Sequence, residues 1–158
     1  MNLALLAARF RLGQLRSEEL SSVGAHLLDR GIDTPAVHSL ATMHAPTLAE
    51  AHELLEQALE DAGVDVPGER EAHWALLNDA LERIVRREID PAEGAYDVWW
   101  QVCQLGEAAS GSADWHQFVA LASKYEDHPR QRDKIGLQIV VAARRRLAAS
   151  GRRPVTVG

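Results

Sequence analysis

Apolar residues recur every three or four positions along nearly the whole chain, and no stretch long enough for a strand alternates with a period of two. A spacing of about 3.6 residues places side chains on one face of an α-helix, whereas strict alternation would indicate a strand. Start and stop signals divide this pattern into about eight segments. We therefore predict an all-α fold, with about eight helices in antiparallel hairpins that form a multi-helix bundle.

The helix boundaries follow from capping residues, prolines and glycines. Ser17 is expected to cap the second helix, the TLAE segment at 47–50 reads as a capping box, and Asp90-Pro91 stops one helix and starts the next. The predicted helices cover residues 2–12, 17–30, 35–45, 47–62, 69–89, 91–105, 113–127 and 129–150.

The length of 158 residues suits one ordinary domain that needs no disulfide or metal to fold. We expect a single helical domain over residues 1–150, in which front helices within 2–62 pack onto a back bundle within 68–149. Residues 151–158 are expected to form a flexible tail.

Two adjacent tryptophans follow the Asp90-Pro91 helix start. The apolar positions of that helix define a buried face, which also takes Trp99. Trp100 lies about 100° further round the same helix, so it is expected at the boundary between core and solvent. An aromatic side chain left there is a candidate contact for a partner.

The formal net charge of −6 is unevenly distributed. Residues 1–66 hold 4 basic and 10 acidic side chains, whereas residues 67–158 hold 13 of each. The helix at 47–62 has no basic residue and presents an acidic face, which would repel phosphates and favours a partner with a basic face. That face consists of Glu50, Glu53, Glu56 and Glu60. Nucleic-acid binding is therefore not expected, and the remaining route to it is the basic run at 144–146.

Cys103 is the only cysteine, which excludes an intrachain disulfide and fits a reducing compartment. We expect a cytoplasmic location. Because Cys103 lies between Val102 and Leu105 in an apolar helix, we expect a small buried side chain of ordinary reactivity. Arg9 and Arg11 interrupt the apolar N-terminal segment, which indicates an amphipathic first helix and no association with a membrane.

Metal and catalytic motifs are absent from the sequence. No histidine follows a glutamate at the Glu-x-x-His spacing of di-iron bundles, and the HELLE segment at 52–56 has a glutamate where a zinc protease has its second histidine. His52, Glu53 and Glu56 remain a weak metal candidate on one helix face, although a solvated, ion-paired face is the simpler interpretation. We expect no catalysis and no cofactor.

Glu126, Asp127 and His128 gather at the junction before the last helix. The simpler interpretation is that Asp127 caps that helix and that the charges are solvated. The alternative is a polar corner, beside Trp100 and Trp115, that recognises a partner or a small ligand.

The segments REIDPAEGAYDVWW and FVALASKYEDHPRQRDKI, within residues 70–148, resemble a pattern in small uncharacterised helical proteins of GC-rich bacteria. The resemblance implies a shared helical fold and supplies no activity or site. It rests on Asp90, Pro91, Gly94, Trp99, Glu126 and Asp127.

Two functions are compatible with this sequence. The first is a non-catalytic cytoplasmic protein-interaction or immunity-type module, with partner-binding candidates Trp100, Glu126, Asp127, His128, Glu53 and Glu56. The alternative is a metal-binding or small-ligand-binding protein, or an enzyme, that uses His52 with Glu53 and Glu56, or Asp127 with His128.

Overall fold

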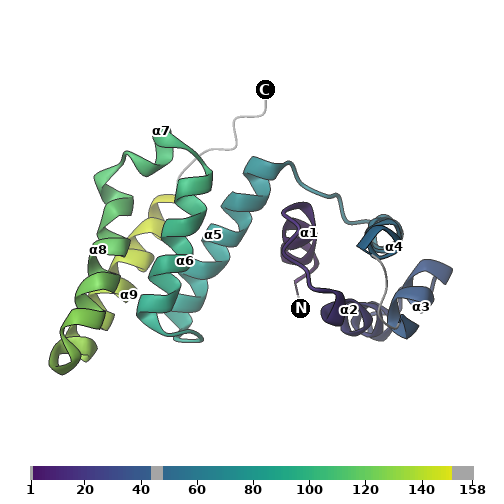
Figure 1. Ribbon diagram of the computed structural model, residues 1–158, viewed down its shortest axis with the longest axis horizontal. Helices are drawn as coiled ribbons and strands as arrows, with labels where there is room; N and C mark the ends of the chain where they lie inside the picture. Colours follow the sequence, from purple (N-terminus) through teal and green to yellow (C-terminus); the bar gives the residue numbers. More distant parts are fainter. Residues whose placement is uncertain (1, 44–47, 151–158) are drawn as a thin grey trace. The chain divides into compact units, whose positions relative to one another are not determined.

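The computed structural model describes residues 2–43 and 48–150, and within them every regular element is helical, which confirms the all-α prediction (Figure 1). All eight predicted helices are present, and α7 and the 3-10 turn η1 are additional short elements. The elements are α1 (Leu3–Arg11), α2 (Ser17–Asp29), α3 (Pro35–Thr42), α4 (Leu48–Asp61), α5 (Glu69–Arg86), α6 (Pro91–Gln104), α7 (Glu107–Ser110), α8 (Ala113–Asp127), η1 (Pro129–Gln131) and α9 (Arg132–Ser150). The capping box expected at 47–50 and the tail expected at 151–158 involve positions outside the described residues.

The chain divides into two compact units, Met1–Ala72 and His73–Gly158, here called the front unit and the back unit. The division falls inside α5, a few residues after the predicted boundary between the front helices and the back bundle. Each unit has a hydrophobic core of its own. The packing of the two into a single domain stays a prediction.

The core of the front unit is built from the apolar stripes of α1 to α4. Phe10 of α1, Leu27 of α2 and Leu55 of α4 belong to the same buried cluster. Helices α2 and α3 cross at Gly24, where an added Cβ would lie within 3.0 Å of the backbone of Leu40 and Ala41. Only glycine allows this close approach of two backbones.

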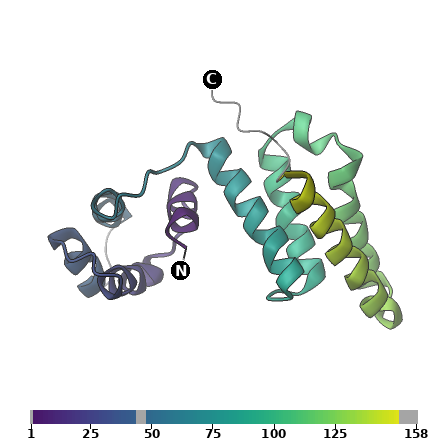
Figure 2. The ribbon, with the colours of Figure 1, turned by 180° about the vertical axis from the view of Figure 1, so that it is seen from behind.

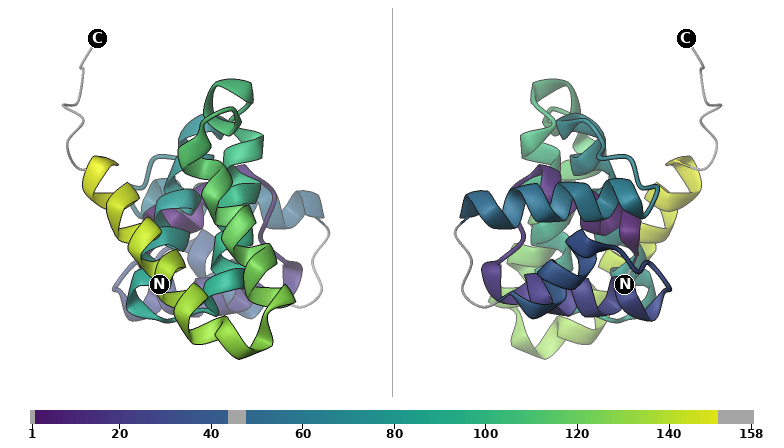
Figure 3. Two further views of the ribbon diagram at one scale, coloured as in Figure 1. Left: turned by 90° about the vertical axis from the view of Figure 1, so that its left-hand side faces the viewer. Right: turned by 90° about the vertical axis from the view of Figure 1, so that its right-hand side faces the viewer.

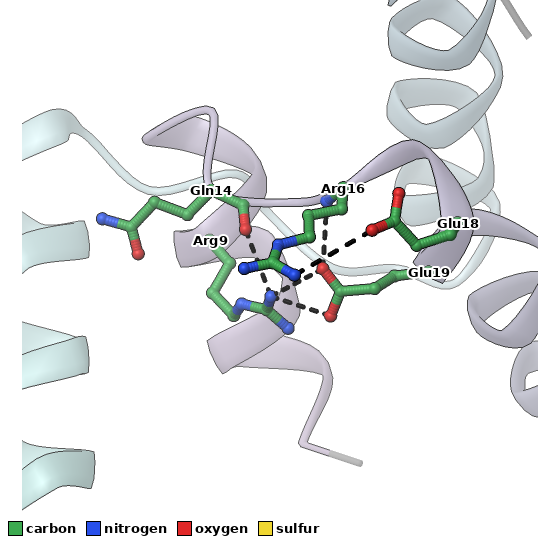
Figure 4. Close-up of polar contacts among 5 residues, drawn as sticks. All are labelled: Arg9, Gln14, Arg16, Glu18 and Glu19. Atoms are coloured by element: carbon green, nitrogen blue, oxygen red, sulfur yellow. Dashed lines mark hydrogen bonds and ion pairs between the residues drawn. The ribbon is translucent and has the colours of Figure 1, made fainter.

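A network of charged side chains joins the end of α1 to the start of α2 (Figure 4). The Arg9 guanidinium donates to both carboxylate oxygens of Glu19 at 2.9 Å, and it also donates to the backbone oxygen of Gln14 at 3.1 Å. The backbone N–H of Arg16 donates to the Glu19 carboxylate at 3.0 Å. The prediction that Ser17 caps α2 is therefore wrong: Arg16 holds the N-cap position, because Glu19 reaches back to its N–H.

The back unit is a bundle in which α6 packs against α8 and α9, and α8 packs against α9 (Figures 1 and 2). Its core contains Leu81 and Ile84 of α5, Val98 of α6 and Phe118 of α8. Gly94 lets α6 approach α5 closely, since an added Cβ would collide with Ile84.

One buried polar pair connects α5 to α6. His73 and Gln101 are 7% exposed each, and His73 Nδ1 lies 2.7 Å from Gln101 Oε1. A buried polar group without a partner is costly, so each side chain satisfies the other. The pair is a specific polar contact between the two helices.

The junction between α5 and α6 confirms one prediction and corrects another. Asp90 caps α6, because its Oδ1 accepts from the backbone N–H groups of Ala92 at 2.9 Å and Glu93 at 3.2 Å. Helix α5, however, ends at Arg86 and not at residue 89, since Arg87 adopts a left-handed conformation with φ of 59°. Glu88, which lies beyond the end of α5, is exposed.

Arg146 of α9 lies over Trp115 of α8, with its guanidinium carbon 3.8 Å from the ring centroid. It also donates to the Asp114 carboxylate at 3.1 Å. Trp115 is 3% exposed and belongs to the core, so it does not stand at the polar corner expected from the sequence. Arg146 consequently fastens α9 to α8 and is not part of a free basic run.

Candidate functional site

The outer face of α6 exposes two aromatic side chains. Trp100 is 59% exposed and Tyr96, one helical turn earlier, is 36% exposed. Neighbours at this spacing lie about 5–6 Å apart between Cβ atoms, so the two side chains form a continuous surface. The prediction that Trp100 is the more exposed tryptophan of the pair is confirmed.

Trp99 was expected in the core, but it is only half-buried. Its ring packs against the ring of His116 on α8, with 4.8 Å between the centroids. The buried face of α6 is centred on Val98 and Val102, and Trp99 lies at the edge of this face, where α8 covers only part of it.

The expectation that Cys103 is buried is wrong, because its side chain is exposed. Cys103 follows Val102 by about 100° around the helix, which places it on the same outer face as Trp100. An apolar neighbour in sequence is therefore a poor guide to burial on a helix.

The acidic corner at the end of α8 contacts this aromatic face through Glu126. The Tyr96 hydroxyl donates to the Glu126 carboxylate at 2.9 Å. This hydrogen bond raises the pKa of Tyr96 above its usual value. It also holds the C-terminal turn of α8 beside the outer face of α6. The structure thus brings Tyr96 and Glu126 together, although they lie 30 positions apart in the sequence.

Asp127 and His128 do not cap the last helix. Asp127 is the exposed last residue of α8. His128 precedes η1 without a side-chain capping bond, and its Nδ1 lies 3.1 Å from the backbone oxygen of Lys124. Both side chains are therefore exposed at the corner next to Glu126.

The metal candidate in the front unit gains no support from the geometry. His52, Glu53 and Glu56 are exposed on α4, and among the described residues no three His, Cys, Asp or Glu side chains group around a common point. The His52 ring instead packs on Phe10, with 4.5 Å between centroids. Together with Leu55 it lines a mainly apolar pocket of about 240 Å³.

The acidic face of α4 is present as predicted, with Glu53, Glu56 and Glu60 all exposed. Glu56 and Glu60 also line a shallow recess of about 350 Å³ together with Asp65. Among the described residues, the recess is lined by carboxylates and by no histidine or cysteine, so it is an electrostatic surface.

The sequence reasoning missed two apolar residues of α9, Leu137 and Val141, which are 54% and 44% exposed. Ile135 and Ile139 of the same helix are buried. Leu137 and Val141 lie off that buried face and one helical turn apart from each other. That spacing was the available signal for an apolar row facing solvent.

Within the described residues, none of the helices combines the length and apolar character needed to cross a bilayer. Comparison of the chain with protein-family models, with curated proteins and with solved structures finds no match in any of the three.

Proposed function

We propose that this protein is a non-catalytic helical module that binds a protein partner through the outer face of α6 and the adjoining end of α8. The proposed contact residues are Tyr96, Trp100, Glu126, Asp127 and His128.

The observation that carries the proposal is the 59% exposure of Trp100 beside Tyr96. Tryptophan and tyrosine are the side chains that most often dominate protein interfaces, because they bury a large area at a small cost in conformational entropy. The hydrogen bond from Tyr96 to Glu126 holds the tyrosine in place before binding. A pre-ordered side chain loses less entropy on association.

The charges around Trp100 favour a basic partner surface. Glu93 and Asp97 lie on α6 within two turns of Trp100 and are exposed, as are Glu126 and Asp127 at the end of α8. Arginine or lysine side chains of a partner could pair with these carboxylates and stack on the Trp100 ring. The acidic face of α4 would favour the same kind of partner.

We infer a bacterial, cytoplasmic setting for this module. The support is the single cysteine, which fits a reducing compartment, and the resemblance of the back half to small helical proteins of GC-rich bacteria.

The test is affinity capture from a lysate of the native host, with the tagged protein beside a Trp100→Ala, Glu126→Ala double variant. We expect a protein that is retained by the wild type and lost from the double variant. Binding of the purified partner should weaken as salt is added, because added ions screen the charge pairs.

Arg144→Ala is the control, since it removes an exposed side chain of α9 that is not among the proposed contact residues. It should retain the partner. Equal retention by the double variant and the wild type would contradict the proposed surface, and so would a partner whose binding does not respond to salt.

The second candidate function is binding of a small ligand, for which the specific observation is the pocket of about 240 Å³ beside His52. Its apolar lining, with Phe10 and Leu55, suits a small apolar molecule rather than a metal ion. A thermal-shift screen with small apolar compounds tests it: a shift seen in the wild type and absent in His52→Ala supports this candidate, and no shift with any compound counts against it.

A further inference from the structure

A groove runs between α8 and α9 on the back unit, where the two helices lie side by side (Figure 3). Its volume is about 540 Å³. The α8 wall includes Leu121 and Lys124, and the α9 wall includes Leu137, Val141 and Arg145. The groove is open to solvent along its length and lies apart from Trp100, which does not line it.

The floor of the groove is a row of apolar side chains. Leu137 and Val141 are one helical turn apart and are 54% and 44% exposed, although large apolar side chains are usually covered. Leu121 contributes to this floor from α8 and is half-buried. Apolar residues one turn apart between two helices match the pattern by which a third amphipathic helix docks in a groove.

The rim of the groove is positively charged. Lys124 and Arg145 line opposite walls, and among the residues that the structure describes no aspartate or glutamate lines the groove. In the part of the chain that the structure describes, neither of these two cations forms an ion pair. Their charges are therefore available to carboxylates of a bound molecule.

We propose that the groove between α8 and α9 binds one amphipathic helix of a protein partner, with apolar residues on the Leu121, Leu137 and Val141 floor and carboxylates against Lys124 and Arg145. This binding site lies outside the proposed contact surface on α6 and the end of α8, here called the Trp100 surface, and does not depend on it. The two sites favour different partner segments. The acidic Trp100 surface favours a basic segment, whereas the basic rim of the groove favours an acidic one.

The shape of the site argues against two other anionic partners. A flat anionic membrane could reach the exposed Leu137 and Val141, but Leu121 is half-buried in the concave wall. A nucleic acid would gain nothing from the apolar floor, and Arg146, which completes the basic run of α9, is engaged with Trp115 and Asp114.

A second copy of this chain does not fit the groove through its own acidic helix. The outer face of α4 carries Glu53, Glu56 and Glu60, but the leucines of that helix that could fill the floor, Leu55 and Leu59, are buried in the front unit. We therefore assign the matching helix to a different protein.

The test uses the full chain and two labelled helical peptides of about four turns, measured by fluorescence anisotropy. One peptide has leucines on one face and glutamates on both flanks, and the other has lysine in place of every glutamate. The acidic peptide should bind and the basic peptide should not. Added salt should weaken the binding, because the rim charges lie at the surface.

The decisive variant reverses both rim charges, with Lys124→Glu and Arg145→Glu together. Both side chains are exposed and outside the core, so the fold should be retained, which circular dichroism would check. The acidic peptide should lose at least about tenfold in affinity, and the basic peptide should gain affinity. Leu137→Ala should also weaken binding of the acidic peptide, whereas Trp100→Ala should leave the affinity for this peptide unchanged.

Several outcomes would overturn the proposal. They are equal binding of the two peptides, retention of the acidic peptide by the charge-reversed variant, and absence of binding by either peptide. Binding to vesicles of equal parts phosphatidylserine and phosphatidylcholine, without binding of the acidic peptide, would assign the groove to a lipid surface instead. Loss of peptide binding in Trp100→Ala would mean that the peptide binds at the Trp100 surface and not in the groove.

Discussion

Neighbouring residues on one helix turn have opposite roles in α6. Trp99 packs on His116 and on the core of the back unit, whereas Trp100 is exposed. The two side chains have the same chemistry, so their difference arises only from the 100° step between consecutive helical positions. Because Trp100 is 59% exposed, a smaller side chain at this position would lose little packing.

Replacing each tryptophan by alanine should separate the two roles. Trp99→Ala should lower the free energy of unfolding by about 2–3 kcal/mol, somewhat less than a fully buried tryptophan, because part of its surface is already in water. Trp100→Ala should change it by no more than about 0.5 kcal/mol. Urea unfolding of both variants measures this, and equal losses would mean that the two side chains pack alike.

A single left-handed residue sets the end of α5. Arg87 has φ of 59°. The backbone N–H of Arg87 donates to the backbone oxygen of Ile84 at 3.1 Å, and the backbone N–H of Glu88 donates to that of Arg83 at 3.0 Å. Helix ends of this kind usually carry glycine, because a Cβ is strained at positive φ.

Arg87→Gly should therefore raise the free energy of unfolding by about 0.5–1 kcal/mol, since it removes the strain and, among the described residues, breaks no ion pair or side-chain hydrogen bond. Thermal unfolding measures the change. The control is Arg86→Gly, at a helical position that also pairs with Glu82 at 2.7 Å, which should lower stability. Destabilisation by Arg87→Gly would show that the arginine side chain contributes more than the strain costs.

At the scale of whole elements, close helix crossings depend on glycine. Gly24→Ala should destabilise the front unit by about 2–3 kcal/mol, because the new methyl group meets the backbone of α3, which cannot rotate away. Gly136→Ala in α9 is the control: its added Cβ would meet Pro91 and Tyr125 at 3.4 Å and 3.5 Å, and alanine favours the helix. Urea unfolding that finds the two substitutions equally costly would contradict the close contact at Gly24.

The junction of α1 and α2 should depend on pH through Glu19. Hydrogen bonds from the Arg16 backbone and from Arg9 hold the pKa of the Glu19 carboxyl below its ordinary value of 4.5. A lowered pKa in the folded state means that the ionised group stabilises the fold above its ordinary pKa, and that this stabilisation is lost as the pH falls through the lowered value.

Glu19→Gln should therefore lower the free energy of unfolding by about 0.5–1 kcal/mol at neutral pH, and the difference from the wild type should vanish in acid. Unfolding measured across this pH range tests it. Glu18→Gln is the matched control, because Glu18 lies 4.0 Å from Arg16 with both side chains largely exposed. A Glu19 difference that persists in acid would assign the effect to packing rather than to charge.

At the scale of the whole molecule, the sequence predicted the helices well because their ends are local. Asp90 at a cap and Gly31 and Gly63 at left-handed positions carry their signals within a few residues. The predicted end of α5 was wrong because Arg87 adopts a left-handed conformation, which is uncommon for arginine and cannot be predicted from the residue type. Ser17 was misassigned because the real cap depends on the side chain of Glu19, held by a residue of another helix.

The candidate surfaces were only partly predictable for a similar reason. Trp100, Glu126 and the acidic face of α4 could be read from helical phase and charge alone. The burial of Trp115 under Arg146, and the groove that Leu121 and Leu137 line together, depend on which helices become neighbours. Helix pairing is a long-range property that the spacing of one segment does not encode.

The exposure of Cys103 has a practical consequence. It is the only thiol in the chain, and it lies three positions from Trp100 on the same outer face of α6. A thiol-reactive dye would therefore attach to the unaltered protein at one known position next to the proposed contact surface. A change in the colour or polarisation of that dye would report when the surface is covered, before the covering molecule has been identified.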